Sequence, residues 1–132
     1  MTRINVGIPP KELSGRHLIA EHREIKRIPN LVKKKYKEKI EKYQSVFFED
    51  LPKQFTLGKG HVIFFYNKLA YIITRYRELY QECINRGYKV QNYESAFEGI
   101  PLDFFGGFQP TLEDIELIKQ RMKENADRKS SN

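Results

Sequence analysis

Apolar and polar positions follow a helical period over three long stretches of the chain. In the first stretch, residues 15–43, the apolar side chains share one broad face. The positions on this face are Leu18, Ile25, Ile28 and Val32. Ser14 is placed to cap the start of the helix, because its hydroxyl can accept a hydrogen bond from a free N–H of the first turn. Pro29 cannot donate a helix hydrogen bond, so we expect a kink or a new cap near Ile28.

Two further helices are expected downstream. The second covers residues 61–86 and stops at Gly87, since glycine readily ends a helix. Its core-facing positions are Phe65, Leu69, Ile72, Tyr76 and Leu79. The third begins after Thr111, which forms a capping-box-like pair with Asp114, and ends near Ala126.

The segments between these helices are irregular. The leader, residues 1–13, contains Gly7 and the pair Pro9-Pro10, so it should form an extended N-terminal arm. Residues 49–60 and 88–110 are rich in turn-forming residues, and residues 127–132 resemble a polar, frayed tail. We therefore expect an all-α fold, with residues 1–132 forming one compact domain of three main helices.

The charge balance narrows the class of partner. Lysine and arginine total 24 against 17 acidic residues, which gives a net charge of +7 and a pI near 9.5. This excess favours an acidic partner such as nucleic acid or an anionic membrane surface, although a solvated basic surface is the simpler alternative. The lone Cys83 excludes an internal disulfide and fits an intracellular protein. No apolar run is long enough for a membrane span.

A run of lysines in the first helical stretch is the most basic segment. Tyr36 and Tyr43 are interleaved with it and could stack on bases or pack internally. The run either binds phosphates without sequence preference or is an ordinary solvated helix face. Its members are Lys33, Lys34, Lys35, Lys37, Lys39 and Lys42.

Two stripes of functional side chains lie next to each other on the same stretch. At 100° per residue, one stripe contains Arg16, Ala20, Arg23 and Arg27. The neighbouring stripe contains His17, Glu21, Glu24 and Ile28. Guanidinium groups suit phosphate contacts, and a carboxylate beside them can accept or donate a proton. The alternative is a solvated face with weak Glu–Arg pairs.

The N-terminus is a candidate nucleophile. If Met1 is removed, Thr2 carries a free α-amine, which is uncharged at pH 7 more often than a lysine side chain and can form an imine. The arm can span about 40 Å, whereas Glu24 lies about 15 Å along the helix, so Thr2 can fold back to it. A short frayed terminus is the alternative. Metal binding is poorly supported, because the histidines form no zinc-site pattern and there is no cysteine pair, although His17 and Glu21 are four positions apart and could share an ion. A phosphate-cradling glycine loop of the P-loop type is missing from the sequence.

Several segments together resemble a known family. They are Met-Thr-Arg-Ile-Asn at residues 1–5, His-Leu-Ile-Ala-Glu-His-Arg-Glu at 17–24, Gly-Lys-Gly-His-Val-Ile-Phe-Phe-Tyr-Asn-Lys-Leu at 58–69, Glu-Cys-Ile-Asn-Arg-Gly at 82–87 and Ile-Pro at 100–101. The chain, nearly to Arg121, resembles the pyrimidine-dimer DNA glycosylases with AP-lyase activity of phage and algal viruses, the endonuclease V type. The resemblance implies an all-α fold and base-excision repair.

The resemblance also implies a mechanism without metal or cofactor. The Thr2 α-amine would attack C1′ of the damaged nucleotide and form an imine, and Glu24 would assist β-elimination. The expected partner is double-stranded DNA with damaged bases, bound by a monomer. The residues expected to contact DNA or line the site are Arg3, Arg16, His17, Arg23, Arg27 and Arg121.

Departures from the family pattern leave alternatives open. Arg16 stands where the family has glutamine, Asn125 stands where a lysine is expected, and the arm is one residue longer. The last five residues contain no aromatic side chain, whereas familiar members use an aromatic tail to read the dimer. A different damaged base or an abasic site is therefore an alternative substrate. A non-catalytic module for bent or damaged DNA, and an RNA-binding or RNA-cleaving protein, are the other two hypotheses.

Overall fold

The first helical stretch is divided into α1 (Gly15–Glu24) and α2 (Arg27–Lys39). The computed structural model describes residues 2–39, 51–58 and 60–130, and side chains in these ranges except at positions 36–39 and 125–130. The interruption expected near Ile28 is confirmed, slightly earlier than predicted, because Pro29 lies in the first turn of α2. There its missing N–H costs no hydrogen bond. The part of the predicted helix beyond position 39 lies outside the described residues.

The second stretch is broken as well, which the sequence did not predict. It consists of α4 (His61–Phe64), the 3₁₀ turn η2 (Phe65–Asn67) and α5 (Leu69–Asn85). Gly106 docks at the break: its N–H donates to the Asn67 carbonyl, and its own carbonyl accepts from the first residues of α5. A Cβ at position 106 would lie 2.5 Å from the Asn67 oxygen, so only glycine permits this approach.

The third helix, α6 (Leu112–Ser130), begins as predicted and ends later. Thr111 Oγ1 accepts from Asp114 N–H at 3.1 Å, and Asp114 Oδ2 accepts from Thr111 N–H at 3.0 Å, which confirms the capping box. The expected end near Ala126 is wrong, because no glycine or proline interrupts the helix before Ser130. The frayed tail expected at 127–132 is therefore helical as far as Ser130, and positions 131–132 lie outside the described residues.

Short turns complete the chain. The arm is mostly extended, but it ends in the 3₁₀ turn η1 (Pro10–Glu12), which the sequence did not predict. Proline at the first position of such a turn is favourable because its φ is already helical. The loop after α5 contains η3 (Glu94–Phe97) and η4 (Leu102–Phe104). Ser14 caps α1 and Gly87 ends α5 with φ 79°, both as predicted.

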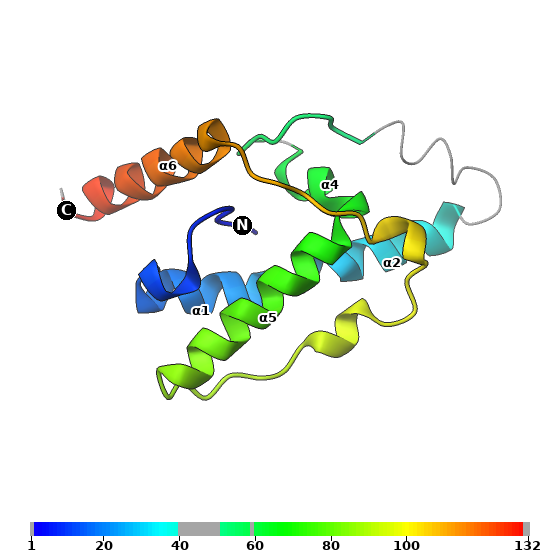
Figure 1. Ribbon diagram of the computed structural model, residues 1–132, viewed down its shortest axis with the longest axis horizontal. Helices are drawn as coiled ribbons and strands as arrows, with labels where there is room; N and C mark the ends of the chain where they lie inside the picture. The colour runs from blue at the N-terminus through cyan, green and yellow to red at the C-terminus, as the bar shows by residue number, and fades with distance from the viewer. Residues whose placement is uncertain (1, 40–50, 59, 131–132) are drawn as a thin grey trace.

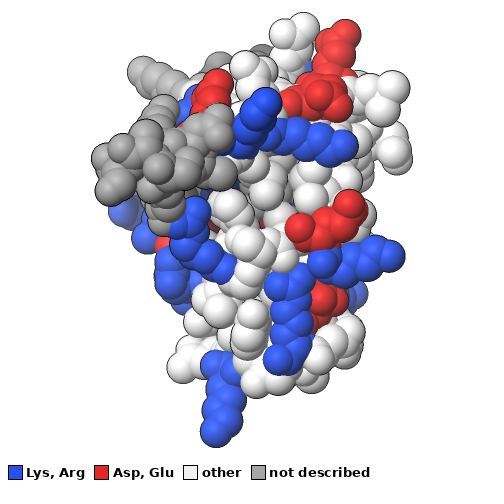
Figure 2. Space-filling view, turned by 90° about the vertical axis from the view of Figure 1, so that its left-hand side faces the viewer, with Lys and Arg blue, Asp and Glu red and all other residues white. Residues whose placement is uncertain are grey.

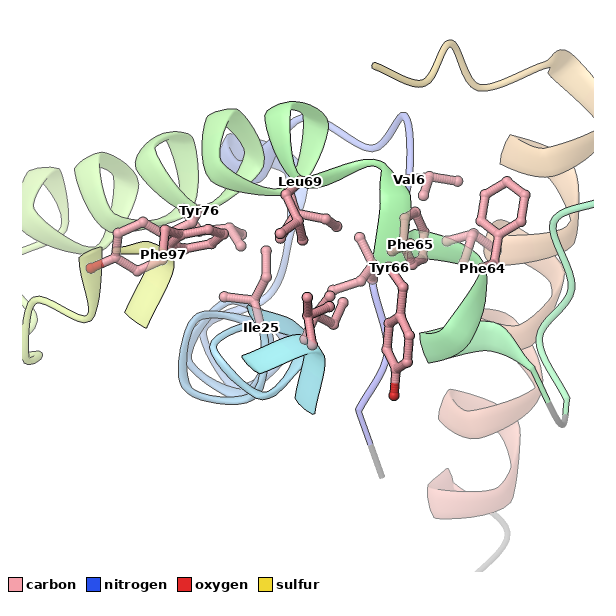
Figure 3. Packing of buried hydrophobic residues seen from close by; sticks show 14 of the residues in the cluster. Val6, Ile25, Phe64, Phe65, Tyr66, Leu69, Tyr76 and Phe97 are labelled. Atoms are coloured by element: carbon pink, nitrogen blue, oxygen red, sulfur yellow. The ribbon is translucent and has the colours of Figure 1, made fainter. Parts of the chain in front are cut away.

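The apolar faces predicted for the first two helical stretches pack together with the arm in one core. The apolar residues expected on the first two helices are all buried: Leu18, Ile25, Ile28, Val32, Phe65, Leu69, Ile72, Tyr76 and Leu79. Figure 1 shows the arm passing between α6 and the crossed pair α1 and α5. Ile4 and Val6 of the arm are fully buried in the same core, where Figure 3 shows Val6 beside Phe64 and Phe65. The fold is all-α, and within the described residues no helix is long and apolar enough to cross a membrane.

Candidate active site

A pocket of about 250 Å³ lies between the arm, α1 and α6. It brings together residues that are far apart in the sequence. Four residues of the predicted site line it, namely Arg3, His17, Glu24 and Arg121. The other lining residues are Asn5, Ala20, Glu21 and Met122. The pocket therefore brings the predicted carboxylate Glu24 together with two of the predicted cations, Arg3 and Arg121, whereas Thr2 is not among the lining residues.

Helix α1 provides one wall of the pocket through its helical spacing. His17, Ala20, Glu21 and Glu24 are separated by three, one and three positions, so they line one face of the helix. Ala20 is small and leaves room between the polar side chains. Both stripes predicted from the sequence contribute, because the pocket is wide enough to take Ala20 from one stripe and the His/Glu row from the other.

Thr2 and Glu24 contact the same guanidinium group. Arg27 Nη1 donates a long hydrogen bond of 3.5 Å to Thr2 Oγ1, and Arg27 Nε lies 2.9 Å from Glu24 Oε2. Arg23 Nε donates to the other carboxylate oxygen of Glu24 at 3.3 Å. Thr2 is buried, and the Glu24 side chain is 16% exposed. The two arginines therefore orient the carboxylate beside the end of the arm.

The far side of the pocket is strongly positive. Burial lowers the pKa of Arg3, and the positive charge of Arg121, which lines the same pocket, lowers it further. Burial and the charge of Arg16 also lower the pKa of His17, while Glu21 opposes the shift, so His17 is neutral at pH 7. A neutral His17 adds no further positive charge to a pocket that Arg3 and Arg121 already line. The cationic wall favours an anionic ligand.

Beneath the pocket lies a buried ion pair that holds the arm. Arg75 of α5 forms two charge-assisted hydrogen bonds to Glu21, Nε to Oε2 at 2.7 Å and Nη2 to Oε1 at 3.0 Å. Asn5 Nδ2 donates to Glu21 Oε1 at 2.8 Å, and Arg75 Nη1 donates to the Ile8 carbonyl at 2.6 Å. The Arg75 and Glu21 side chains are 5% and 1% exposed. The pair therefore joins α1, α5 and the arm.

His61 makes a second buried contact with the arm. Its Nδ1 donates to the Thr56 carbonyl at 2.8 Å, so the neutral ring accepts the Ile4 N–H at Nε2, 2.9 Å away. Burial lowers the pKa of His61 to about 4; the Thr56 hydrogen bond opposes this shift, and the charge of Arg3 adds to it. His61 is therefore neutral at pH 7, the state in which it can hold the arm.

The remaining predicted residues take different places. Arg16 is exposed and does not line the pocket, while Arg23 and Arg27 are exposed on the rim beside Glu24. Lys33, Lys34 and Lys35 are partly or fully exposed on α2. The other basic and aromatic members of that run, and Asn125, lie outside the described side chains.

Several residues of this site are not predicted from the sequence. Asn5 and Met122 line the pocket, and Arg75 and His61 hold the arm beside it. Glu21 lies on the predicted His/Glu stripe, but its pairing with Arg75 is not predicted. The spacing of the motif around His61 carries no sign of a contact 57 positions away. Within the described residues, no three His, Cys, Asp or Glu side chains gather closely enough to hold a metal ion.

Basic residues are also exposed at one end of the molecule. Figure 2 views the end of the molecule where α1 begins and α6 ends, and it shows many Lys and Arg side chains with fewer Asp and Glu among them. Such a face can attract a polyanion over a larger area than the pocket itself.

The family described as pyrimidine dimer DNA glycosylase matches residues 1–93 of this chain. The matched segment includes the arm and every described helix from α1 to α5, and it contains Thr2, Glu24, His61 and Arg75. Helix α6, which contributes Arg121 and Met122 to the pocket, lies outside the match.

Proposed function

The chain belongs to the pyrimidine dimer DNA glycosylase family, and on this basis we propose that it is a bifunctional DNA glycosylase and AP lyase. Its reactive group is the α-amine of Thr2, and its acid/base is Glu24. The observation that carries the proposal is the single Arg27 guanidinium that contacts both Thr2 Oγ1 and Glu24 Oε2. This shared contact supports a position of the end of the arm close to the carboxylate, which itself lines the pocket.

The first step is base displacement. The amine lone pair attacks C1′ of the damaged nucleotide, the bond from C1′ to the base breaks, and the base leaves with that electron pair and takes up a proton. The amine loses a proton and the sugar ring opens at O4′, which is protonated. An iminium ion between Thr2 and C1′ results. The Glu24 carboxylate stabilises this positive charge, since Glu24 and Thr2 contact the same Arg27 side chain.

The second step is strand cleavage. Glu24 removes a proton from C2′, and the electrons of that C–H bond form a C1′=C2′ double bond while the C=N pair moves onto the Thr2 nitrogen. The nitrogen lone pair then re-forms the C=N bond, the C1′=C2′ pair shifts to form C2′=C3′, and the bond from C3′ to its phosphate oxygen breaks. The 3′ phosphate leaves with the electron pair, and water then hydrolyses the imine to release the Thr2 amine. Both steps use the α-amine of Thr2, which is bound in a peptide bond as long as Met1 is present. Met1 must therefore be removed before the protein can act.

The cations around the pocket have a binding role in this proposal. Arg3 and Arg121 both line the pocket and suit DNA phosphates next to the damaged nucleotide. Arg23 and Arg27 orient Glu24 and remain exposed enough to contact the backbone. We propose double-stranded DNA as substrate, bound by one copy of the chain, with the damaged nucleotide turned out of the stack.

The test is reductive trapping on DNA that contains one abasic site. Borohydride should reduce the imine to a stable adduct, and mass spectrometry of the digested protein should find it on the N-terminal peptide beginning at Thr2. A variant that retains Met1 should give no adduct while it still binds DNA. If the processed protein forms no adduct, or if the adduct lies on a lysine, the proposal is wrong.

The preferred lesion is a separate matter, because α6 contributes to the pocket and lies outside the family match. Met122 provides an apolar contact where a damaged base can pack, and Arg121 provides a charge. Incision of matched duplexes containing a pyrimidine dimer, an oxidised pyrimidine or an abasic site measures this preference directly. We propose the dimer as the best substrate; faster base release from another lesion would change that assignment.

A further inference from the structure

The arm is tied to α5 at more than one point along its length. Arg75 donates to the Ile8 carbonyl at 2.6 Å. Arg86, at the end of the same helix, donates through Nη2 to the carbonyls of Pro10 and Lys11 at 3.2 and 3.1 Å. The two arginines are about three helical turns apart and therefore share one side of α5. They hold the arm by its backbone, whatever the side chains of the arm are.

The Glu21–Arg75 pair is more than packing between α1 and α5. A buried ion pair loses much of its Coulomb energy to desolvation, and apolar residues of similar volume often replace it without loss of stability. Apolar residues could not, however, accept the Asn5 amide or donate to the Ile8 carbonyl, as the pair does here. The charged pair therefore fixes the course of the arm through these two hydrogen bonds, which apolar residues cannot form.

We propose that Arg75 is a positioning residue for the reaction: through Glu21 and Asn5 it sets the direction in which the arm leads to Thr2. This inference rests on the proposed role of the Thr2 amine. His61 fixes the arm at the Ile4 N–H, and the Asn5 contact fixes the next residue. One anchor fixes a point, whereas two successive anchors also fix a direction. Without the second anchor the amine would swing about Ile4 and meet C1′ less often.

The test replaces the pair by apolar residues in the double variant Glu21→Leu/Arg75→Met, in protein that begins at Thr2. Three quantities are compared with the wild type. They are the rate of imine trapping on abasic-site DNA, the affinity for that DNA, and the rate of borohydride trapping of Thr2 by free propionaldehyde. The matched control is Arg77→Met/Glu94→Leu, which removes an exposed ion pair between α5 and η3.

We expect the double variant to fold, to bind DNA nearly as tightly as the wild type, and to react normally with propionaldehyde. Imine trapping on DNA should be slower by roughly 100-fold, since a misplacement of about 1 Å can have that effect. The control should match the wild type in all three measurements. This pattern separates positioning from folding, because an unfolded protein would lose DNA binding as well.

A second variant, Asn5→Ala, leaves the ion pair intact and removes its hydrogen bond to the arm. Because Asn5 also lines the pocket, the DNA affinity of this variant is measured beside its rate of trapping. Imine trapping on DNA should be slower in Asn5→Ala, as in the double variant. If the Glu21 charge acted directly on the substrate, Asn5→Ala would not slow trapping, because it retains that charge. It also provides the test if the double variant does not fold. Unchanged trapping on DNA in both variants would overturn the inference while the proposed function stands. If wild-type protein forms no adduct at Thr2, the proposed function fails first and this inference fails with it.

Discussion

In the proposed mechanism single residues of the site have separable tasks, and Glu24 is the clearest case. Its carboxylate is held by Arg23 and Arg27, and through Arg27 it lies beside Thr2. In the proposed mechanism the amine forms the covalent bond, whereas the carboxylate acts mainly on the proton at C2′. Removing the charge without changing the size of the side chain should therefore separate the two steps.

The variant Glu24→Gln should retain imine formation in part and lose strand cleavage by about 10²–10⁴-fold, the usual contribution of a positioned acid or base. The ratio of trapped adduct to cleaved strand, measured in a single turnover, should rise accordingly. Glu98→Gln, at an exposed position of the loop after η3, is the matched control. Equal cleavage rates in Glu24→Gln and wild type would exclude Glu24 as the base.

The buried position of His61 predicts that the unfolding free energy falls in acid. Burial lowers its pKa from 6.5 to about 4, so the folded state prefers the neutral ring. The stability that this preference provides is fully present above pH 6.5 and is lost as the pH falls toward 4. It amounts to about 3 kcal/mol, to order of magnitude. Protonation would also place an N–H against the Ile4 N–H, which removes one anchor of the arm.

The comparison that tests this is between wild type and His61→Phe, which cannot titrate. Their difference in unfolding free energy, measured with urea, should favour the wild type at pH 7 and shrink by about 3 kcal/mol at pH 4. Carboxylates titrate in both proteins and cancel in the difference. A constant difference between the two pH values would mean that the His61 pKa is not depressed.

Among the elements, the packing of α6 on the arm decides the shape of the pocket. Gly7 lies at a turn of the arm with φ 73°, and a Cβ there would lie 2.4 Å from Ile115 Cγ1 of α6. Only glycine tolerates both the backbone angle and the close approach. Since Arg121 and Met122 are on the same helix, a displacement of α6 would also move one wall of the pocket.

We expect Gly7→Ala to lower the unfolding free energy by about 1–3 kcal/mol, through backbone strain and overpacking. It should also weaken binding of abasic-site DNA, because Arg121 would move. Gly58→Ala is the control, since no atom lies within 4 Å of its added Cβ and its φ is not positive. If Gly7→Ala and Gly58→Ala have the same unfolding free energy in urea and the same affinity for abasic-site DNA, this prediction is wrong.

At the scale of the whole molecule, the net charge of +7 attracts DNA phosphates at distances longer than any contact within the site. Each cation that neutralises a phosphate releases counterions, so affinity for undamaged duplex should fall steeply as salt rises. Arg16 is exposed and does not line the pocket, so its contribution should be of this general kind.

The variant Arg16→Gln should reduce the slope of log affinity against log salt by about one, as expected for the loss of one phosphate contact. Imine trapping at saturating DNA should not change. Arg77→Gln, which removes an arginine paired with Glu94, is the control and should leave the slope as it is. A fall in trapping at saturation would instead place Arg16 in the chemistry.

The sequence by itself determined those features that depend on neighbouring residues. The all-α class and the buried faces follow from the helical period. The caps at Ser14 and Thr111 and the stop at Gly87 follow from contacts within one turn of a helix. The suspected family was also readable, because its motifs are contiguous, and the match over residues 1–93 confirms it.

Only the tertiary structure decided the features that join distant segments. The break between η2 and α5 depends on Gly106, the burial of the arm depends on His61 and Arg75, and the pocket needs α6 as its third wall. Each of these contacts brings together residues whose separation along the chain leaves no periodic signal. A helix can be predicted from spacing because its partners are three or four residues away, whereas the course of the arm depends on His61 and Arg75, which bind Ile4 and Ile8 from more than fifty residues further along.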